Sequence, residues 1–186
     1  MPPRLPLTTD RLLLLAQDYV SRFGGPSQNL QRVLQRHVDR RLQELREAGD
    51  HDTAEVEGLA WPAQIRQVVQ QMVAAGAVDD DRFAEAAARV WAQKGIPEVM
   101  VQQRLAAKGI AGPARTQAIA AVRADHPEGD AALQTAHAYA RRRGLGPYRR
   151  GDLQADRREK DLQAMLRAGH AFAVAKQVIG GEPLSR

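Results

Sequence analysis

Three segments of this sequence repeat the pattern of one amphipathic helix, each beginning with Asp, running for fifteen residues and ending with Gly. They are Asp10–Gly24, Asp81–Gly95 and Asp130–Gly144. Small or apolar side chains recur at the third, fourth, seventh, tenth and eleventh positions of each segment, which is the spacing of one helix face. Asp can cap the start of a helix, and Gly can end one. The sequence therefore predicts a repeat protein whose units cover one another's apolar faces.

Each repeated helix is followed by two further segments with a helical pattern. The second segments end at Gly49, Gly109 and Gly169, and the third segments align on Gln67, Gln117 and Gln177. Strand patterns are missing from the sequence. We therefore expect an all-α fold of three tandem three-helix repeats, about nine helices in total: an N-terminal tail and the first repeat over residues 1–78, the second over 79–128 and the third over 129–186.

The first repeat is ten residues longer than the others between the end of its second segment and the start of its third. The extra residues fall in the acidic stretch Asp50–Trp61. Acidic insertions between periodic segments are typical of surface loops. We therefore expect a loop over about residues 50–60, and we expect that deleting Asp50–Gly58 leaves the helical content intact.

Composition limits where the protein works and what it binds. The chain has no cysteine, which excludes disulfides and fits a reducing cytoplasm. Its longest leucine run, Leu12–Leu15, is too short to span a membrane. We expect a cytoplasmic protein with no membrane partner. The net charge of +5 favours a polyanionic partner without requiring one.

Signatures of catalysis and of metal binding are missing from the sequence. There is no phosphate-binding glycine loop and no nucleophile elbow, and none of the five histidines is three or four residues from another. The triplet Asp79–Asp81 is explained by helix capping, as at Asp10 and Asp130. We expect no enzymatic activity, no cofactor and no metal site.

Arginines are the better functional candidates, because guanidinium groups bind phosphates and carboxylates in bidentate geometry. Arg141, Arg142 and Arg143 end the first helix of the third repeat. The helix dipole needs only one or two such cations, so either a polyanion contact or a solvated basic patch explains the remainder. The same reading covers the basic residues that follow: Arg149, Arg150, Arg157 and Arg158.

A second basic stripe lies on the second helix of the first repeat. Arg32, Arg36 and Arg40 are spaced four residues apart and therefore share one helix face. A binding face and a plain solubilising face both account for this pattern.

The middle of the chain resembles a known family. It contains the run GAVDDDRFA at residues 76–84, then KGIP at 94–97 and QRLAAKGI at 103–110. This order and spacing are similar to the central signature of the RecX family of recombination regulators. The resemblance is strongest over Val68–Ile110 and extends through the repeats to about Asp10–Gly180.

The resemblance implies an elongated, curved array of the three repeats. It also implies a protein without enzymatic activity that binds the RecA recombinase and its filament on single-stranded DNA. Such a protein would inhibit ATP hydrolysis and strand exchange, and so affect recombination, DNA repair and the SOS response. Lys94 and Lys108, at the turns of the signature, join the candidate contacts, and we expect a monomer. An autonomous helical nucleic-acid-binding protein and a helical protein-interaction scaffold are the alternatives.

Overall fold

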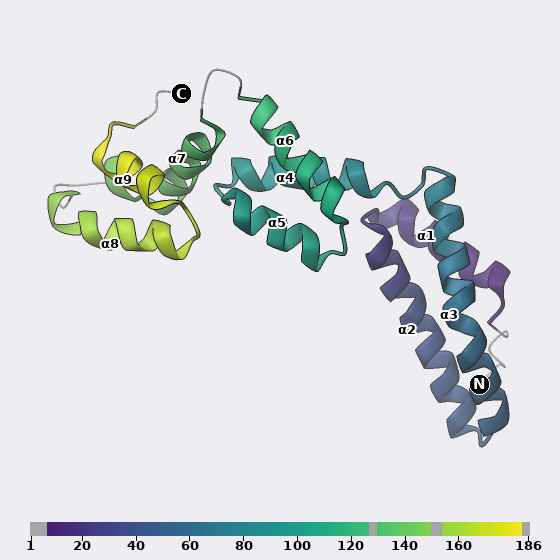
Figure 1. The fold of residues 1–186 in the computed structure, drawn as a ribbon. Coiled ribbons are helices and arrows are strands. Elements are labelled where there is room, and N and C mark those ends of the chain that lie inside the picture. The colour runs from purple at the N-terminus through teal and green to yellow at the C-terminus, as the bar shows by residue number, and fades with distance from the viewer. Residues whose placement is uncertain (1–6, 127–129, 150–153, 184–186) are drawn as a thin grey trace. The chain divides into compact units, whose positions relative to one another are not determined.

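A computed structural model describes residues 7–126, 130–149 and 154–183 of the chain, and these residues form nine α-helices, one 3-10 turn and no strand (Figure 1). The expected all-α fold is confirmed. The chain divides into two compact parts, an N-terminal unit of residues 1–80 and a C-terminal unit of residues 81–186. Within the described residues, no helix is both long enough and apolar enough to cross a bilayer.

The N-terminal unit consists of α1 (Thr9–Phe23), α2 (Ser27–Glu47) and α3 (His51–Ala74), and the two longer helices lie side by side (Figure 1). Its core forms where α2 places one apolar residue on the same face in each turn. The buried residues include Leu12 and Ala16 of α1. They also include Leu30, Leu34, Val38, Leu42 and Leu45 of α2, and Ala54, Trp61, Ile65, Val68 and Met72 of α3.

The expected loop over residues 50–60 is wrong, because this segment forms the beginning of α3. The carboxylate of Asp50 accepts a hydrogen bond from the backbone N–H of Thr53 and so caps the helix. Ala54 and Trp61, seven residues apart, face the core and are buried. The acidic residues between them suggest a loop, but Glu55 is exposed on the helix, and Glu57 accepts a hydrogen bond from Nε1 of Trp61. The additional residues therefore lengthen α3.

Deleting residues 50–58 is accordingly expected to reduce helicity. The deletion removes the cap and the first two turns of α3, and it uncovers Leu42 and Leu45 on α2. Far-ultraviolet circular dichroism measures the effect. A spectrum with undiminished helical signal would support the loop expected from the sequence.

The C-terminal unit contains two groups of three helices, each with its own apolar cluster. The first group is α4 (Asp80–Gln93), α5 (Glu98–Ala107) and α6 (Gly112–Ala124). The second is α7 (Ala131–Arg143), α8 (Gln154–Arg167) and α9 (Phe172–Gly180), with the 3-10 turn η1 (Gly146–Tyr148). These groups fall within residues 79–128 and 129–186, where the second and third repeats are expected, and the division into repeats stays a prediction. The stacking of all three repeats into a curved array stays a prediction.

The repeated stripe is confirmed at its centre and wrong at its edges. Ala84 and Ala136 are fully buried, as the stripe requires. Val90 is 44% exposed and Ala132 is exposed, whereas Ala88, outside the stripe, is fully buried. In α4 the buried face therefore follows the four-residue spacing from Ala84 to Ala88, which turns Val90 toward solvent.

Two of the Asp residues expected to cap the repeated helices have other roles in the structure. Thr8, rather than Asp10, caps α1 by accepting from the N–H of Arg11. Asp80 caps a distant helix, because its carboxylate accepts from the backbone N–H and hydroxyl of Ser27, at 2.7 and 2.6 Å, at the start of α2. Asp130 caps α7 as expected, accepting from the N–H of Ala132.

Candidate partner-binding surface

The three consecutive arginines Arg141–Arg143 form the last turn of α7, and all three are exposed. The helix ends at Gly144, whose φ of 63° and ψ of 47° are left-handed, so glycine is favoured there. The guanidinium carbon of Arg141 lies 5.4 Å from the centroid of the Tyr148 ring. The hydroxyl of Tyr148 is 2.9 Å from Nδ1 of His137, so the ring under Arg141 is itself fixed. Arg141 therefore has a defined position on the surface.

Arg149 belongs to a different environment, because its guanidinium is held by the carboxylate of Asp161. Asp161 is 4% exposed and also accepts from the backbone N–H of Gly146 at 2.9 Å. This arrangement joins η1 to α8. Arg149 thus stabilises the turn that carries Tyr148.

The remaining C-terminal candidates follow in α8. Arg157 and Arg158 are exposed on this helix. Arg150 lies outside the described residues. The structure therefore leaves Arg157 and Arg158 available for contacts with a partner.

Two further cations are ordered on aromatic rings between α4 and α5. Nζ of Lys108 lies 5.8 Å from the centroid of Phe83, and the guanidinium carbon of Arg104 lies 5.7 Å from the centroid of Trp91. Such contacts stabilise by about 0.5–1 kcal/mol at exposed sites. Lys94 is exposed beside the turn at Gly95.

Arg104 is a candidate that the sequence analysis missed. It is one turn before Lys108, which directly follows α5, and its side chain lies over the ring of Trp91 on α4. Phe83 and Trp91 are only partly buried, so their rings are available to cations. The four-residue spacing of the two cations within the family signature could have drawn attention to this pair.

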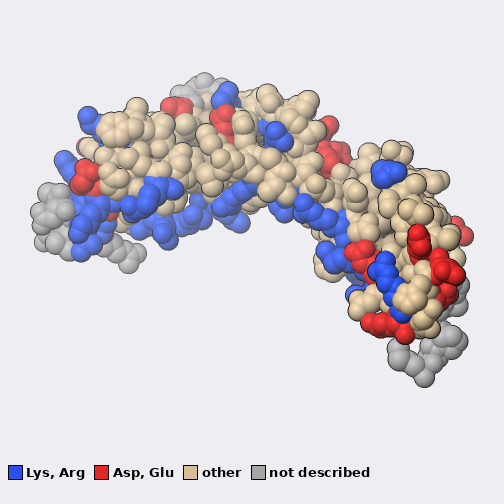
Figure 2. Space-filling view, turned by 60° about the horizontal axis from the view of Figure 1, so that its bottom comes forward, with Lys and Arg blue, Asp and Glu red and all other residues tan. Residues whose placement is uncertain are grey.

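Figure 2 shows how these charges are distributed: Lys and Arg atoms gather along the lower side of the C-terminal unit, which is at the left of that view. The face above this row is largely uncharged in the same view. A row of cations such as this one is typical of surfaces that bind polyanions.

The basic stripe of α2 is also exposed at each of its predicted members, Arg32, Arg36 and Arg40. Nη2 of Arg32 donates to Oε1 of Gln28 at 2.8 Å. Partial burial lowers the pKa of His37, and three nearby cations lower it further: Arg40, Arg36 and Arg11. The stripe therefore belongs to a locally positive surface, which is compatible with both a binding and a solubilising role.

Two more histidines are perturbed in the C-terminal unit. Burial, and then the charge of Arg141, lowers the pKa of His137. Burial lowers the pKa of His170, partly offset by a hydrogen bond to the backbone of Gly95. Throughout the described ranges, the structure contains no group of three His, Asp or Glu side chains placed to hold a metal ion.

The lowered pKa of His170 predicts a pH-dependent stability. Because the unfolded chain binds a proton near pH 6.5 and the folded chain binds it only at a lower pH, the free energy of unfolding should fall as the pH drops below 6.5. Urea unfolding of the wild type and of His170→Gln at several pH values between 7 and 5.5 measures this. The variant should lose less stability over that interval. Parallel pH profiles for the two proteins would contradict the assignment.

Comparisons with known proteins place the chain in a family. No family model matches it, and no solved structure matches it. It is 31% identical over 169 residues to the Regulatory protein RecX of Myxococcus xanthus, an alignment covering 90% of this chain and 83% of the relative. It is 30% identical over 122 residues to the Regulatory protein RecX of Agrobacterium fabrum, covering 63% of this chain and 62% of the relative. The chain therefore belongs to the RecX family of regulatory proteins.

Proposed function

We propose that the chain regulates the RecA recombinase by binding its filament on single-stranded DNA, and that it inhibits ATP hydrolysis and strand exchange. Membership of the RecX family supports a regulatory role. The observation that carries the proposal is the set of cations held on aromatic rings in the C-terminal unit, Arg104, Lys108 and Arg141. In this proposal the protein acts as a cytoplasmic monomer in recombination and DNA repair, without catalysis of its own.

The proposed mechanism is electrostatic and steric. Guanidinium and ammonium groups bind DNA phosphates and protein carboxylates, and each phosphate contact releases counterions, so affinity falls steeply with salt. Cations that rest on rings lose less side-chain freedom when they bind than free cations do. A bound helical protein would then block the movements between recombinase subunits on which hydrolysis and strand exchange depend.

One observation favours a second candidate, an autonomous nucleic-acid-binding protein. Phe83, Trp91 and Tyr148 are partly exposed, and rings beside cations can stack on unpaired bases. Tight binding to bare single-stranded DNA in a gel shift, equal with and without recombinase, would select this alternative. A protein-interaction scaffold would instead be insensitive to removal of the arginines.

The test of the proposal replaces Arg141, Arg142 and Arg143 with Ala. If each contacts a phosphate, inhibition of DNA-dependent ATP hydrolysis should need roughly tenfold more protein, and the slope of log affinity against log salt should fall by about two. ATP turnover by recombinase on single-stranded DNA, with this protein titrated in, measures both. Wild-type inhibition by the variant would exclude this turn of α7 from the interface.

A matched control removes the same charge elsewhere. Arg22, Arg46 and Arg66 are exposed in the N-terminal unit and are not candidate contacts. Their triple Ala variant lowers the net charge equally. It should therefore show only the small, nonspecific loss that a change in total charge produces. Equal losses in the two triple variants would mean that total charge, and no defined site, governs inhibition.

A further inference from the structure

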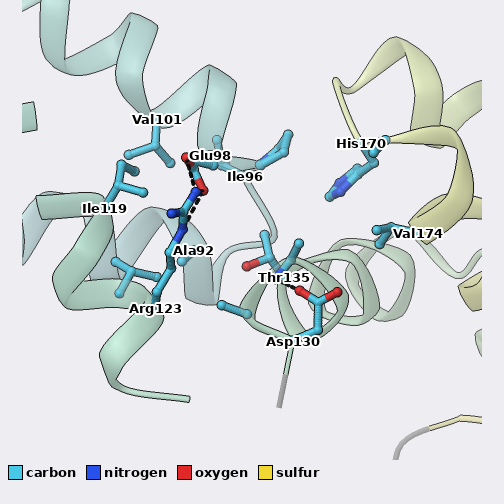
Figure 3. A pocket seen from close by; sticks show the side chains of 16 residues that line it. Ala92, Ile96, Glu98, Val101, Ile119, Arg123, Asp130, Thr135, His170 and Val174 are labelled. Carbon is cyan, nitrogen blue, oxygen red and sulfur yellow. Dashed lines mark hydrogen bonds and ion pairs between the residues drawn. The ribbon is translucent and has the colours of Figure 1, made fainter. Parts of the chain in front are cut away.

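The two helical groups of the C-terminal unit line a partly open cavity of about 460 Å³ that the proposed function does not use. It lies between α4, α5 and α6 on one side and α7 and α9 on the other. Its walls are mostly apolar and include Ile96, Val101, Ile119, Val122 and Val174 (Figure 3). Pockets of roughly 300–1,000 Å³ with apolar walls and few polar groups are typical of small-ligand sites.

The charged residues that line the cavity are already paired with one another or with the backbone. Nη2 of Arg123 lies 2.8 and 2.7 Å from the carboxylate oxygens of Glu98, and its Nε lies 3.1 Å from one of them. The carboxylate of Asp130 accepts from the N–H of Ala132 at 2.8 Å. A charged ligand would have to break one of these pairs. The cavity therefore favours a neutral ligand.

His170 supplies a polar group whose hydrogen-bonding capacity is incompletely used. Its side chain points toward the cavity in Figure 3, and the residue is 5% exposed. Among the residues that the structure describes, its Nε2 has no hydrogen-bond partner. The hydrogen bond to the backbone of Gly95 raises the pKa, as expected when the ring is the donor. A neutral ring that donates there presents its other nitrogen as an acceptor.

Leaving a buried acceptor without a partner is unfavourable, so such an atom indicates a missing donor. Nε2 is itself covered by protein atoms, so the ring has to turn toward the cavity for a donor to reach it, and a single water there would leave most of an apolar cavity of this size unfilled. A ligand that fills the space and donates one hydrogen bond meets both requirements. Aromatic rings with a hydroxyl or ring N–H combine these properties.

We propose that this cavity binds a neutral aromatic group that donates one hydrogen bond to Nε2 of His170. The chemistry is that of a phenol or an indole. A free small molecule can provide it, and so can a Tyr or Trp side chain of a protein partner. The bound ring contacts both helical groups of the C-terminal unit and holds them together.

The experiment uses 2-naphthol and 2-methylnaphthalene, which have nearly the same shape, although only the first can donate a hydrogen bond. Spectra of isoleucine methyl groups report where they bind, because the chain has five isoleucines. Ile96 and Ile119 line the cavity. The other three provide an internal control outside it: Ile65, Ile110 and Ile179.

We expect 2-naphthol to shift the methyl signals of Ile96 and Ile119 alone, and to bind about tenfold more tightly than 2-methylnaphthalene. Equal affinities would overturn the hydrogen bond to His170. Shifts spread over all isoleucines, or none at saturating probe, would overturn the site.

A filled cavity provides an independent test. Ala132 lines the cavity from an exposed position of α7, so Ala132→Leu should fold normally and abolish the methyl shifts. Ala124→Leu, exposed on α6 and outside the lining, is the matched control and should bind as the wild type does. Retained binding by Ala132→Leu would contradict the proposal.

The same variants distinguish the two sources of the ring. If Ala132→Leu inhibits recombinase ATP hydrolysis normally, the natural occupant is a free molecule. If it loses inhibition while Ala124→Leu does not, the occupant is a side chain of the partner. The methyl measurements need no recombinase, so failure of the proposed function and failure of this site are separate results.

Discussion

Gly95→Ala is expected to destabilise the C-terminal unit by roughly 2–5 kcal/mol. Gly95 has a φ of 75°, where a side chain costs about 1–2 kcal/mol. A Cβ there would also lie 2.3 Å from the backbone nitrogen and 2.4 Å from the Cα of Tyr139 on α7. Because the neighbour is backbone, it can move away only if α7 moves, and overpacking of this kind costs about 1–3 kcal/mol more. Urea denaturation followed by circular dichroism measures the loss.

Gly144→Ala separates these two causes. Gly144 has a similar positive φ of 63°, but the nearest atom to an added Cβ is 3.9 Å away. We expect this variant to lose only the backbone contribution, about 1–2 kcal/mol. If both variants lose the same stability, the close approach of the Gly95 turn to α7 is not part of the folded protein in solution.

Asp161→Ala is expected to cost about 3 kcal/mol or more. The substitution removes the acceptor for the backbone N–H of Gly146 and leaves the guanidinium of Arg149, 21% exposed, without its carboxylate. Breaking a buried ion pair from one side costs about 3–5 kcal/mol, because the other charge stays buried. The midpoint of urea unfolding should fall, with little change in its steepness.

Asp125→Ala is the matched control in the same unit. Asp125 pairs with Nε of Arg89 at 2.8 Å, but the two side chains are 45% and 39% exposed. Exposed pairs contribute about 0–1 kcal/mol, so the loss should be correspondingly small. A loss at Asp161 no larger than that at Asp125 would show that the Asp161 carboxylate does not stabilise η1.

The sequence predicted the features that depend on short-range spacing. The first helices of the three repeats begin within two residues of Asp10, Asp81 and Asp130, and each ends before its Gly, because caps and apolar periodicity are local signals. The acidic stretch after Gly49 was misread because charge alone does not distinguish a loop from the outer face of a helix. The buried spacing of Ala54 and Trp61 was the better signal.

Features created by contacts between distant segments could not be predicted. The carboxylate of Asp80 accepts a hydrogen bond from Ser27, 53 residues away in the sequence. The carboxylate of Asp161 binds the guanidinium of Arg149, which is therefore less available to a partner. Local sequence spacing predicts neither of these two pairs. The cavity beside His170 forms where two helical groups approach each other, so no sequence motif predicts it. The cations were predicted as a class, but the rings that support Lys108 and Arg141 were not.

The turn at Gly95 presses against α7, and the turn at Gly169 lies against Pro97 and Met100 of the preceding helical group. Two contacts of this kind make the six helices of residues 81–186 interdependent. Hydrogen exchange should then report one shared opening event for both groups, with neither group losing protection first. Separating the chain between α6 and α7 would expose the apolar surface at both contacts, so each helical group should be less stable alone than in the intact unit.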